Sequence, residues 1–170
     1  MNKKFLATLA LLAVGTYAVA AAAATNPAQA NFNVKLTINS ACTVSTNGDI
    51  TLGPADANST TNLSANATNV SVICSKNTSY TIGLQPSDGN LLGTGVMKGT
   101  GTNSDTITYA LQDSTGAVWG DTVSTNRKTG VVSTDGTTAQ KYTPYVKVLG
   151  SALNVTPDSY TDNVTVNVYY

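Results

Sequence analysis

The chain has 170 residues and a formal net charge of +0, with 41% hydrophobic and only 11% charged residues. It contains no histidine, which excludes a histidine-based catalytic triad and a histidine-liganded metal site. Nine Lys and Arg residues are few for a surface that binds phosphate backbones, so we expect no nucleic acid partner. This length predicts one domain rather than two.

Residues 1–30 have the layout of a secretory signal peptide. Lys3 and Lys4 precede an apolar run that continues to about Val19 and then becomes alanine-rich. Three cleavage points between residues 20 and 30 fit the small-residue rule, with the later ones favoured: after Ala20, Ala24 or Ala30. The alternative is an uncleaved membrane anchor. Cleavage would leave seven basic and nine acidic residues, a net charge of −2, on an exported protein.

Two cysteines, Cys42 and Cys74, follow the predicted signal. Outside a reducing cytosol, two cysteines in one small domain usually pair. A bridge between them would close a loop of about 33 residues, for which chain entropy predicts roughly 3.5–4 kcal/mol of stabilisation. A redox or nucleophilic cysteine is the alternative, but neither residue lies in a C-x-x-C pair and no histidine can lower a thiol pKa.

Apolar and polar residues alternate in several short segments, as in strands with one buried face. These segments are 32–38, 70–74, 80–84, 107–111, 142–148 and 164–170, with a weaker one at Val131 and Val132. Turn residues separate them at 47–49, 86–90, 113–116, 135–136 and 157–158. The pattern predicts an all-β sandwich. Two stretches, 53–69 and 85–105, lack the alternation, and the second has the composition of a long loop.

The sequence contains no convincing catalytic or cofactor-binding motif. Gly93-Thr94-Gly95 with Lys98 lacks the residue order of a phosphate loop and is followed by no helical pattern. Asp113 to Gly116 resembles one half of an acid-protease dyad, but a turn explains it better because Asp135-Gly136-Thr137 is a poor match for the second loop. The sequence therefore predicts a protein that is not an enzyme and uses no metal or cofactor.

The two ends of the predicted domain carry the most informative patterns. The segment 31–41 precedes the first cysteine and presents four apolar side chains in register: Phe32, Val34, Leu36 and Ile38. At the other end, no strand follows Val164 to Tyr170 in this sequence. A sandwich without its last strand would have an apolar groove with unpaired backbone groups, which an alternating segment could fill by strand addition. The segment could fill its own groove, fill that of the next copy to form an open filament, or be an ordinary first strand.

Four ordered runs resemble the spore coat protein U family and, within it, the major shaft pilins of archaic chaperone–usher pili. The runs are N-V-K-L-T-I-N-S-A-C-T-V (33–44), V-S-V-I-C-S (70–75), I-T-Y-A-L leading to V-W-G-D (107–121) and P-D-S-Y-T-D-N-V-T-V (157–166). Together they span nearly all of the chain after the signal. The loop 85–105 matches poorly.

This resemblance implies an incomplete immunoglobulin-like sandwich, residues 42–170, that is completed by donor-strand exchange. The four apolar residues of segment 31–41 would be the donor groups, and Val164, Val166 and Val168 would line part of the acceptor groove. Tyr169 and Tyr170 lie where this class ends in aromatic residues. The Cys42–Cys74 bridge would hold the shape of the groove before it is filled. The implied partners are other copies of the chain, a periplasmic chaperone, an outer-membrane usher, and tip and minor pilins.

The leading hypothesis is therefore a pilin that polymerises head-to-tail into a surface fibre for adhesion and biofilm formation. Two alternatives are a fibre-tip adhesin and a self-complemented secreted coat or carbohydrate-binding protein. About 140 residues after the signal would leave no room for the receptor-binding domain that tip subunits add. The single tryptophan, Trp119, is thin support for a sugar platform and is expected to pack or cap a strand.

Overall fold

The computed structural model describes residues 26–66 and 69–170, so the predicted signal peptide lies almost entirely outside the described residues. The chain divides into two compact units, Met1–Thr37 and Ile38–Tyr170. Residues 26–37, the described part of the first unit, form neither helix nor strand. No helix among the described residues is long and apolar enough to cross a membrane.

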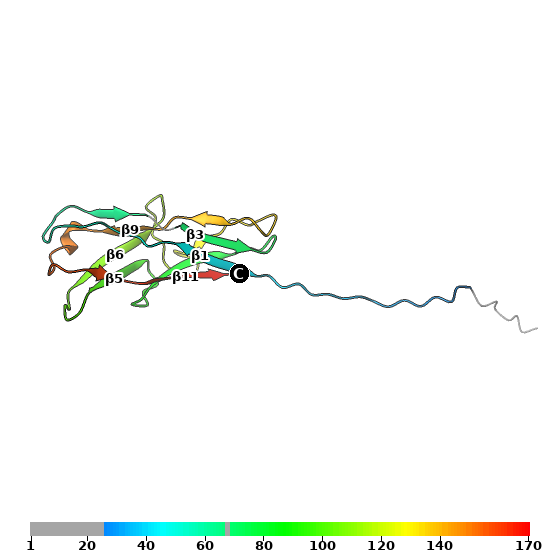
Figure 1. The fold of residues 1–170 in the computed structure, drawn as a ribbon. Coiled ribbons are helices and arrows are strands. Elements are labelled where there is room, and N and C mark those ends of the chain that lie inside the picture. The colour runs from blue at the N-terminus through cyan, green and yellow to red at the C-terminus, as the bar shows by residue number, and fades with distance from the viewer. Residues whose placement is uncertain (1–25, 67–68) are drawn as a thin grey trace, which may run out of the picture. The chain divides into compact units, whose positions relative to one another are not determined.

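The second unit is built from short β-strands and one 3-10 turn (Figure 1). The elements are β1 (Cys42–Asn47), β2 (Leu63–Ala65), β3 (Asn69–Cys74), β4 (Thr81–Pro86), β5 (Thr94–Gly99), β6 (Thr106–Gln112), β7 (Lys128–Thr129), β8 (Gln140–Tyr142), β9 (Tyr145–Val148), η1 (Gly150–Ala152), β10 (Tyr160–Thr161) and β11 (Val164–Tyr169).

The strands form three antiparallel sheets with the orders β1–β3–β8, β11–β4–β7 and β10–β5–β6–β9–β2. The chain changes sheet between β8, which pairs with β3, and β9, which pairs with β6. Pro144 lies between these two strands, where its missing backbone N–H removes no hydrogen bond between strands. Strands from all three sheets contribute to one hydrophobic core. The prediction of an all-β, immunoglobulin-like sandwich is confirmed.

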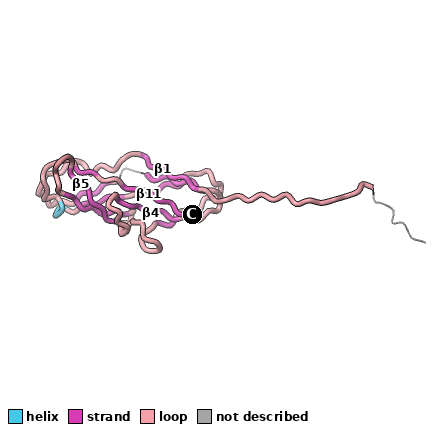
Figure 2. Tube along the Cα trace, turned by 90° about the horizontal axis from the view of Figure 1, so that it is seen from below, coloured by secondary structure: helices cyan, strands magenta, loops and turns pink. Residues whose placement is uncertain are grey.

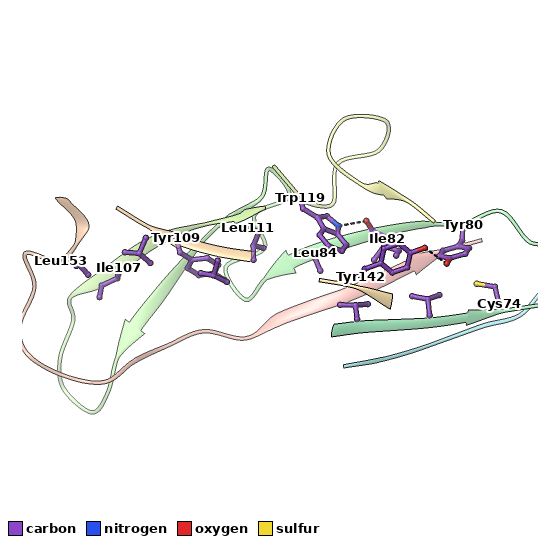
Figure 3. Close-up of a cluster of buried hydrophobic side chains, with 14 residues drawn as sticks. Cys74, Tyr80, Ile82, Leu84, Ile107, Tyr109, Leu111, Trp119, Tyr142 and Leu153 are labelled. Atoms are coloured by element: carbon purple, nitrogen blue, oxygen red, sulfur yellow. Dashed lines mark hydrogen bonds between the residues drawn. The ribbon is translucent and has the colours of Figure 1, made fainter. Parts of the chain in front are cut away.

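The core contains the apolar faces that period-two alternation predicted. Figure 3 shows these side chains gathered in one cluster, which comprises Val70, Val72, Cys74, Tyr80, Ile82, Leu84, Ile107, Tyr109, Leu111, Trp119, Tyr142, Val146, Val148 and Leu153. The Trp119 indole N–H donates to the Ile82 carbonyl at 3.0 Å, and its ring meets Tyr142 edge-on at 6.5 Å between centroids. Trp119 is therefore buried, as expected for a residue that packs on a strand rather than one that presents a sugar platform.

Two local predictions are wrong. The expected long loop 85–105 contains β5, which pairs with β6 from Thr94 to Lys98. Gly95, in β5, leaves room for the Tyr109 ring, since a Cβ at this position would lie 2.4 Å from the ring. Glycine here therefore permits close packing and does not mark a turn. The weak segment at Val131 and Val132 is not a strand, and both side chains are exposed. The predicted turn at Asp113 is confirmed, because the Gly116 N–H donates to the Asp113 carbonyl at 3.0 Å.

Candidate functional site

A long groove of about 970 Å³ is open along one side of the sandwich. One wall is formed by the end of β1 and the segment after it, residues 46–57, and the other by residues 155–166, which lead into β11. Its floor is the apolar core itself and includes Val70, Leu84, Ile107, Leu111, Val146, Val148 and Leu153. The groove therefore reaches down to the hydrophobic core, although each of these floor residues is at most 8% exposed.

The strands beside the groove are edge strands. Within the described chain, β1 pairs with β3 alone and β11 pairs with β4 alone (Figure 2 shows β11 between β1 and β4). Each strand thus keeps one side on which its backbone N–H and C=O groups have no neighbouring strand. Apolar floor and open edges together are the features that strand addition requires.

The predicted acceptor residues lie on β11, except Tyr170, which directly follows it, and not all of them line the groove. Val164 and Val166 line it, are half-buried and pack against the core. Val168 also packs against the core, but it is not among the lining residues. Tyr169 and Tyr170 are exposed and lie beyond the groove. The alternation that predicted an inward face on this strand therefore places its first two valines in the groove.

The wall formed by residues 46–57 was not predicted. Ile50 and Leu52 are half-buried in it and pack against the core. The I-T-L alternation at 50–52 was a weak signal, because the surrounding residues are small or polar and give no sustained period.

A hydrogen bond inside the groove joins the floor to the wall. The Tyr109 hydroxyl on β6 donates to Asp162 Oδ2 at 2.6 Å. Burial, together with this hydrogen bond, raises the pKa of the Tyr109 phenol, which therefore stays protonated and keeps donating. Ser87 also donates to the Asp162 carboxylate. These bonds fix the chain just before β11 begins.

A second polar cluster, which the sequence did not predict, holds the later part of β11. Asp121 is only 3% exposed, and its carboxylate accepts hydrogen bonds from Arg127 Nε at 2.7 Å, Asn167 Nδ2 at 2.8 Å and the Tyr169 hydroxyl at 2.8 Å. The Arg127 guanidinium also lies 3.5 Å from the centre of the Tyr169 ring. Gly83 on β4 makes room for the carboxylate, since a Cβ there would lie 1.8 Å from Asp121 Oδ1. We call these residues the Asp121 cluster.

The predicted donor segment is exposed. Phe32, Val34, Leu36 and Ile38 are 83–87% exposed, an unusual state for four large apolar side chains spaced two residues apart. Residues 26–41 belong to no strand in the described structure.

The disulfide lies at the start of the sandwich. Cys42 and Cys74 are bonded, with an S–S distance of 2.01 Å, and are partners in the β1–β3 register. Cys74 is buried in the core, so the bridge fixes the first residue of edge strand β1 to central strand β3. Among the described residues, no group of three His, Cys, Asp or Glu side chains could hold a metal ion.

Comparison with known proteins agrees with this architecture. No curated protein sequence matches the chain. A chain in the crystal structure of the CsuC–CsuE chaperone–tip adhesion subunit pre-assembly complex, from archaic chaperone–usher Csu pili of Acinetobacter baumannii, is similar in fold, with a TM-score of 0.53 and 24% identity. The match covers 79% of this chain but 40% of that one. Residues 28–167 match the model of the Spore Coat Protein U domain, and the chain therefore belongs to the Spore Coat Protein U domain family.

Proposed function

We propose that this protein is a non-enzymatic pilin, which polymerises head-to-tail by donor-strand complementation into a surface fibre for adhesion and biofilm formation. The donor residues Phe32, Val34, Leu36 and Ile38 of one copy enter the acceptor groove of the next copy. The observation that carries this proposal is an open apolar groove in a chain that also has four exposed, alternating apolar side chains.

The energies fit a durable fibre. Each buried Phe, Val, Leu or Ile side chain contributes roughly 1.5–3 kcal/mol, so four contribute about 6–12 kcal/mol before any hydrogen bonds form. Backbone bonds to the open edge of β11, which borders the groove at Val164 and Val166, add about 0.5–1.5 kcal/mol each. The contact between copies is heterologous, because the donor and the groove are different surfaces, and such contacts build open filaments.

The partners follow from the same groove. A pre-assembly complex of the kind crystallised for the Csu system pairs a chaperone with a subunit. We propose that a periplasmic chaperone covers this groove after export and that an outer-membrane usher replaces it with the donor segment of the next copy. Tip and minor pilins would complete the fibre at the cell surface.

Two other functions make different predictions. A fibre-tip adhesin fits the description of the complex that contains the similar chain, but this chain spans only 40% of that chain. A self-complemented coat or carbohydrate-binding protein would fill its own groove and remain a soluble monomer. The oligomeric state of the purified mature protein distinguishes these functions. A self-complemented protein is a monomer, whereas a pilin forms fibres or needs a chaperone.

The decisive experiment places a charge in the donor segment. Leu36→Asp would bury a carboxylate in the apolar groove and should abolish fibres in electron micrographs of cells that also express the chaperone and usher. The matched control is Thr37→Asn, a polar change without added charge one residue later, on the opposite face of the extended segment, and it should leave fibres intact. Leu36→Asp subunits should still co-purify with the chaperone, whose contact is with the groove. Normal fibres from Leu36→Asp would show that this segment is not the donor.

A further inference from the structure

The walls of the acceptor groove are acidic. Asp49 and Asp56 line one wall, and Asp158 and Asp162 line the other, whereas no Lys or Arg is among the lining residues. Four of the nine acidic residues of the chain thus border this one surface. Lys98, on β5 opposite Thr161, lies nearby but follows the groove residue Met97 and so points to the other face of its sheet.

The carboxylates of the two walls differ in their hydrogen bonding. Asp158 accepts hydrogen bonds from Thr100 and Asn103, and these bonds lower its pKa to about 2, so it is ionised at neutral pH. Asp162 is bound by Tyr109, as described above. Asp49 and Asp56 are exposed, and neither carboxylate accepts a hydrogen bond from another described residue. These two carboxylates are therefore available to an incoming cation.

The donor segment supplies one cation. Residues 31–41 contain a single charged residue, Lys35, between the apolar donors Val34 and Leu36. In an extended chain its side chain points away from those donors, hence toward the groove mouth when they point inward. A lysine stem is long and flexible enough to lie along apolar surface while its ammonium group reaches a polar rim.

We propose that Lys35 of one copy is attracted by the acidic walls of the next copy's groove, chiefly by Asp49 and Asp56, and that this attraction speeds donor-strand entry. The inference rests on the proposed function and concerns its rate and selectivity. The occupant is a second copy of this chain, since its segment combines the apolar spacing that fits the floor with the charge that complements the walls. Rim charges of this kind change association rate and salt dependence more than final affinity.

Polymerisation of the full mature chain, followed by light scattering after dilution from denaturant, tests this inference. In 10 mM salt, where charges act over about 30 Å, Lys35→Gln should polymerise about 3- to 10-fold more slowly than wild type. In 1 M salt, where they act over about 3 Å, the two rates should converge. Asp49→Asn with Asp56→Asn should reproduce both results. Lys76→Gln, which removes an exposed lysine after β3, is the matched control and should polymerise at the wild-type rate.

Each outcome decides between the possibilities. Equal rates for Lys35→Gln and wild type in 10 mM salt would overturn the inference, as would equal slowing by Lys76→Gln, which would indicate an effect of net charge. Failure of the proposed function gives a different result. Leu36→Asp would then polymerise as wild type does, and this result would refute both the pilin function and the role of Lys35. If Leu36→Asp blocks assembly while Lys35→Gln leaves the rate unchanged, the pilin function stands and the role of Lys35 does not.

Discussion

Removing the Asp121 carboxylate should destabilise the sandwich more than any other single loss of a polar group that we describe. Asp121 is 3% exposed and accepts hydrogen bonds from Arg127, Asn167 and Tyr169. Asp121→Ala would leave a largely buried guanidinium and two further donors without their acceptor. Breaking a buried ion pair in this way typically costs about 3–5 kcal/mol, a large part of the roughly 5–15 kcal/mol that stabilises a small domain.

The partners of Asp121 allow the cost to be divided. Tyr169→Phe removes one hydroxyl donor but keeps the ring beneath the Arg127 guanidinium, so we expect a loss of about 1–1.5 kcal/mol. The adjacent Tyr170 is more exposed and has no interaction with the Asp121 cluster in the described structure. Tyr170→Phe is therefore a matched control, with an expected change below about 0.5 kcal/mol.

Equilibrium unfolding in urea measures these changes, with the fluorescence of the single, buried Trp119 as the signal. The variants are compared in a Leu36→Asp background, chosen to keep copies from polymerising. With a slope of about 1.5 kcal/mol per molar urea, Asp121→Ala should lower the midpoint by about 2–3 M. A shift below about 0.5 M, or equal shifts for Tyr169→Phe and Tyr170→Phe, would refute the view that this cluster fixes β11.

Two further predictions concern the disulfide and acid sensitivity. The Cys42–Cys74 bridge closes a loop with a sequence separation of 32, so reducing it should lower the free energy of unfolding in urea by about 3.7 kcal/mol. The variant Cys42→Ser should accumulate to a lower yield in the periplasm for the same reason. An unchanged yield would mean that the bridge is dispensable. The pKa of Asp158 is lowered from 3.8 to about 2 by hydrogen bonds from Thr100 and Asn103, so its stabilisation is present above pH 4 and lost as pH falls toward 2. The urea midpoint should therefore fall less between pH 7 and pH 2.5 in Asp158→Asn than in wild type. An equal fall in both proteins would contradict the stabilising role of the ionised Asp158 carboxylate.

Period-two alternation predicted the core strands because each has one face in the core. Val70 and Val72, or Ile107 and Tyr109, are buried while their neighbours are not, and this contrast is visible in sequence. The same reasoning missed β5, since Gly95 is required by the close approach of the Tyr109 ring on the neighbouring strand and not by local turn chemistry. Sequence patterns report the burial of a segment's own side chains, whereas the glycine in β5 reflects packing against the next strand, β6.

The candidate site was predictable only in part for a related reason. Val164 and Val166 line the groove, and their alternation indicated an inward face. The Asp121 cluster could not be found this way, because residues 121, 127, 167 and 169 share no spacing and meet only in the folded sandwich. The W-G-D run that contains Asp121 marked a resemblance without indicating what the carboxylate binds.

Sequence alternation also could not decide whether the donor segment fills its own groove, but the link to β1 limits that choice. Ala41 already continues the β1–β3 ladder, since its carbonyl accepts from the Ser75 N–H at 2.8 Å and its N–H donates to Ser75 Oγ at 3.1 Å. Only Asn39 and Ser40 then remain to reverse the chain. Two-residue hairpin turns favour glycine, and a serine at the second position fits them poorly.

Such a hairpin would also put the donor residues in the wrong place. With Ile38 opposite Ala41, antiparallel pairing along β1 would set Leu36 opposite residue 43, Val34 opposite residue 45 and Phe32 opposite residue 47. The groove wall begins only at Thr46, so three of the four donor side chains would lie short of it. In the proposed exchange, segment 31–41 of another copy would have no such tether and could slide until all four side chains lay over the apolar floor. The short link thus favours exchange between copies over self-filling, and it predicts that inserting a flexible Gly-rich linker after Ile38 should convert polymers into soluble monomers, as size-exclusion chromatography would reveal.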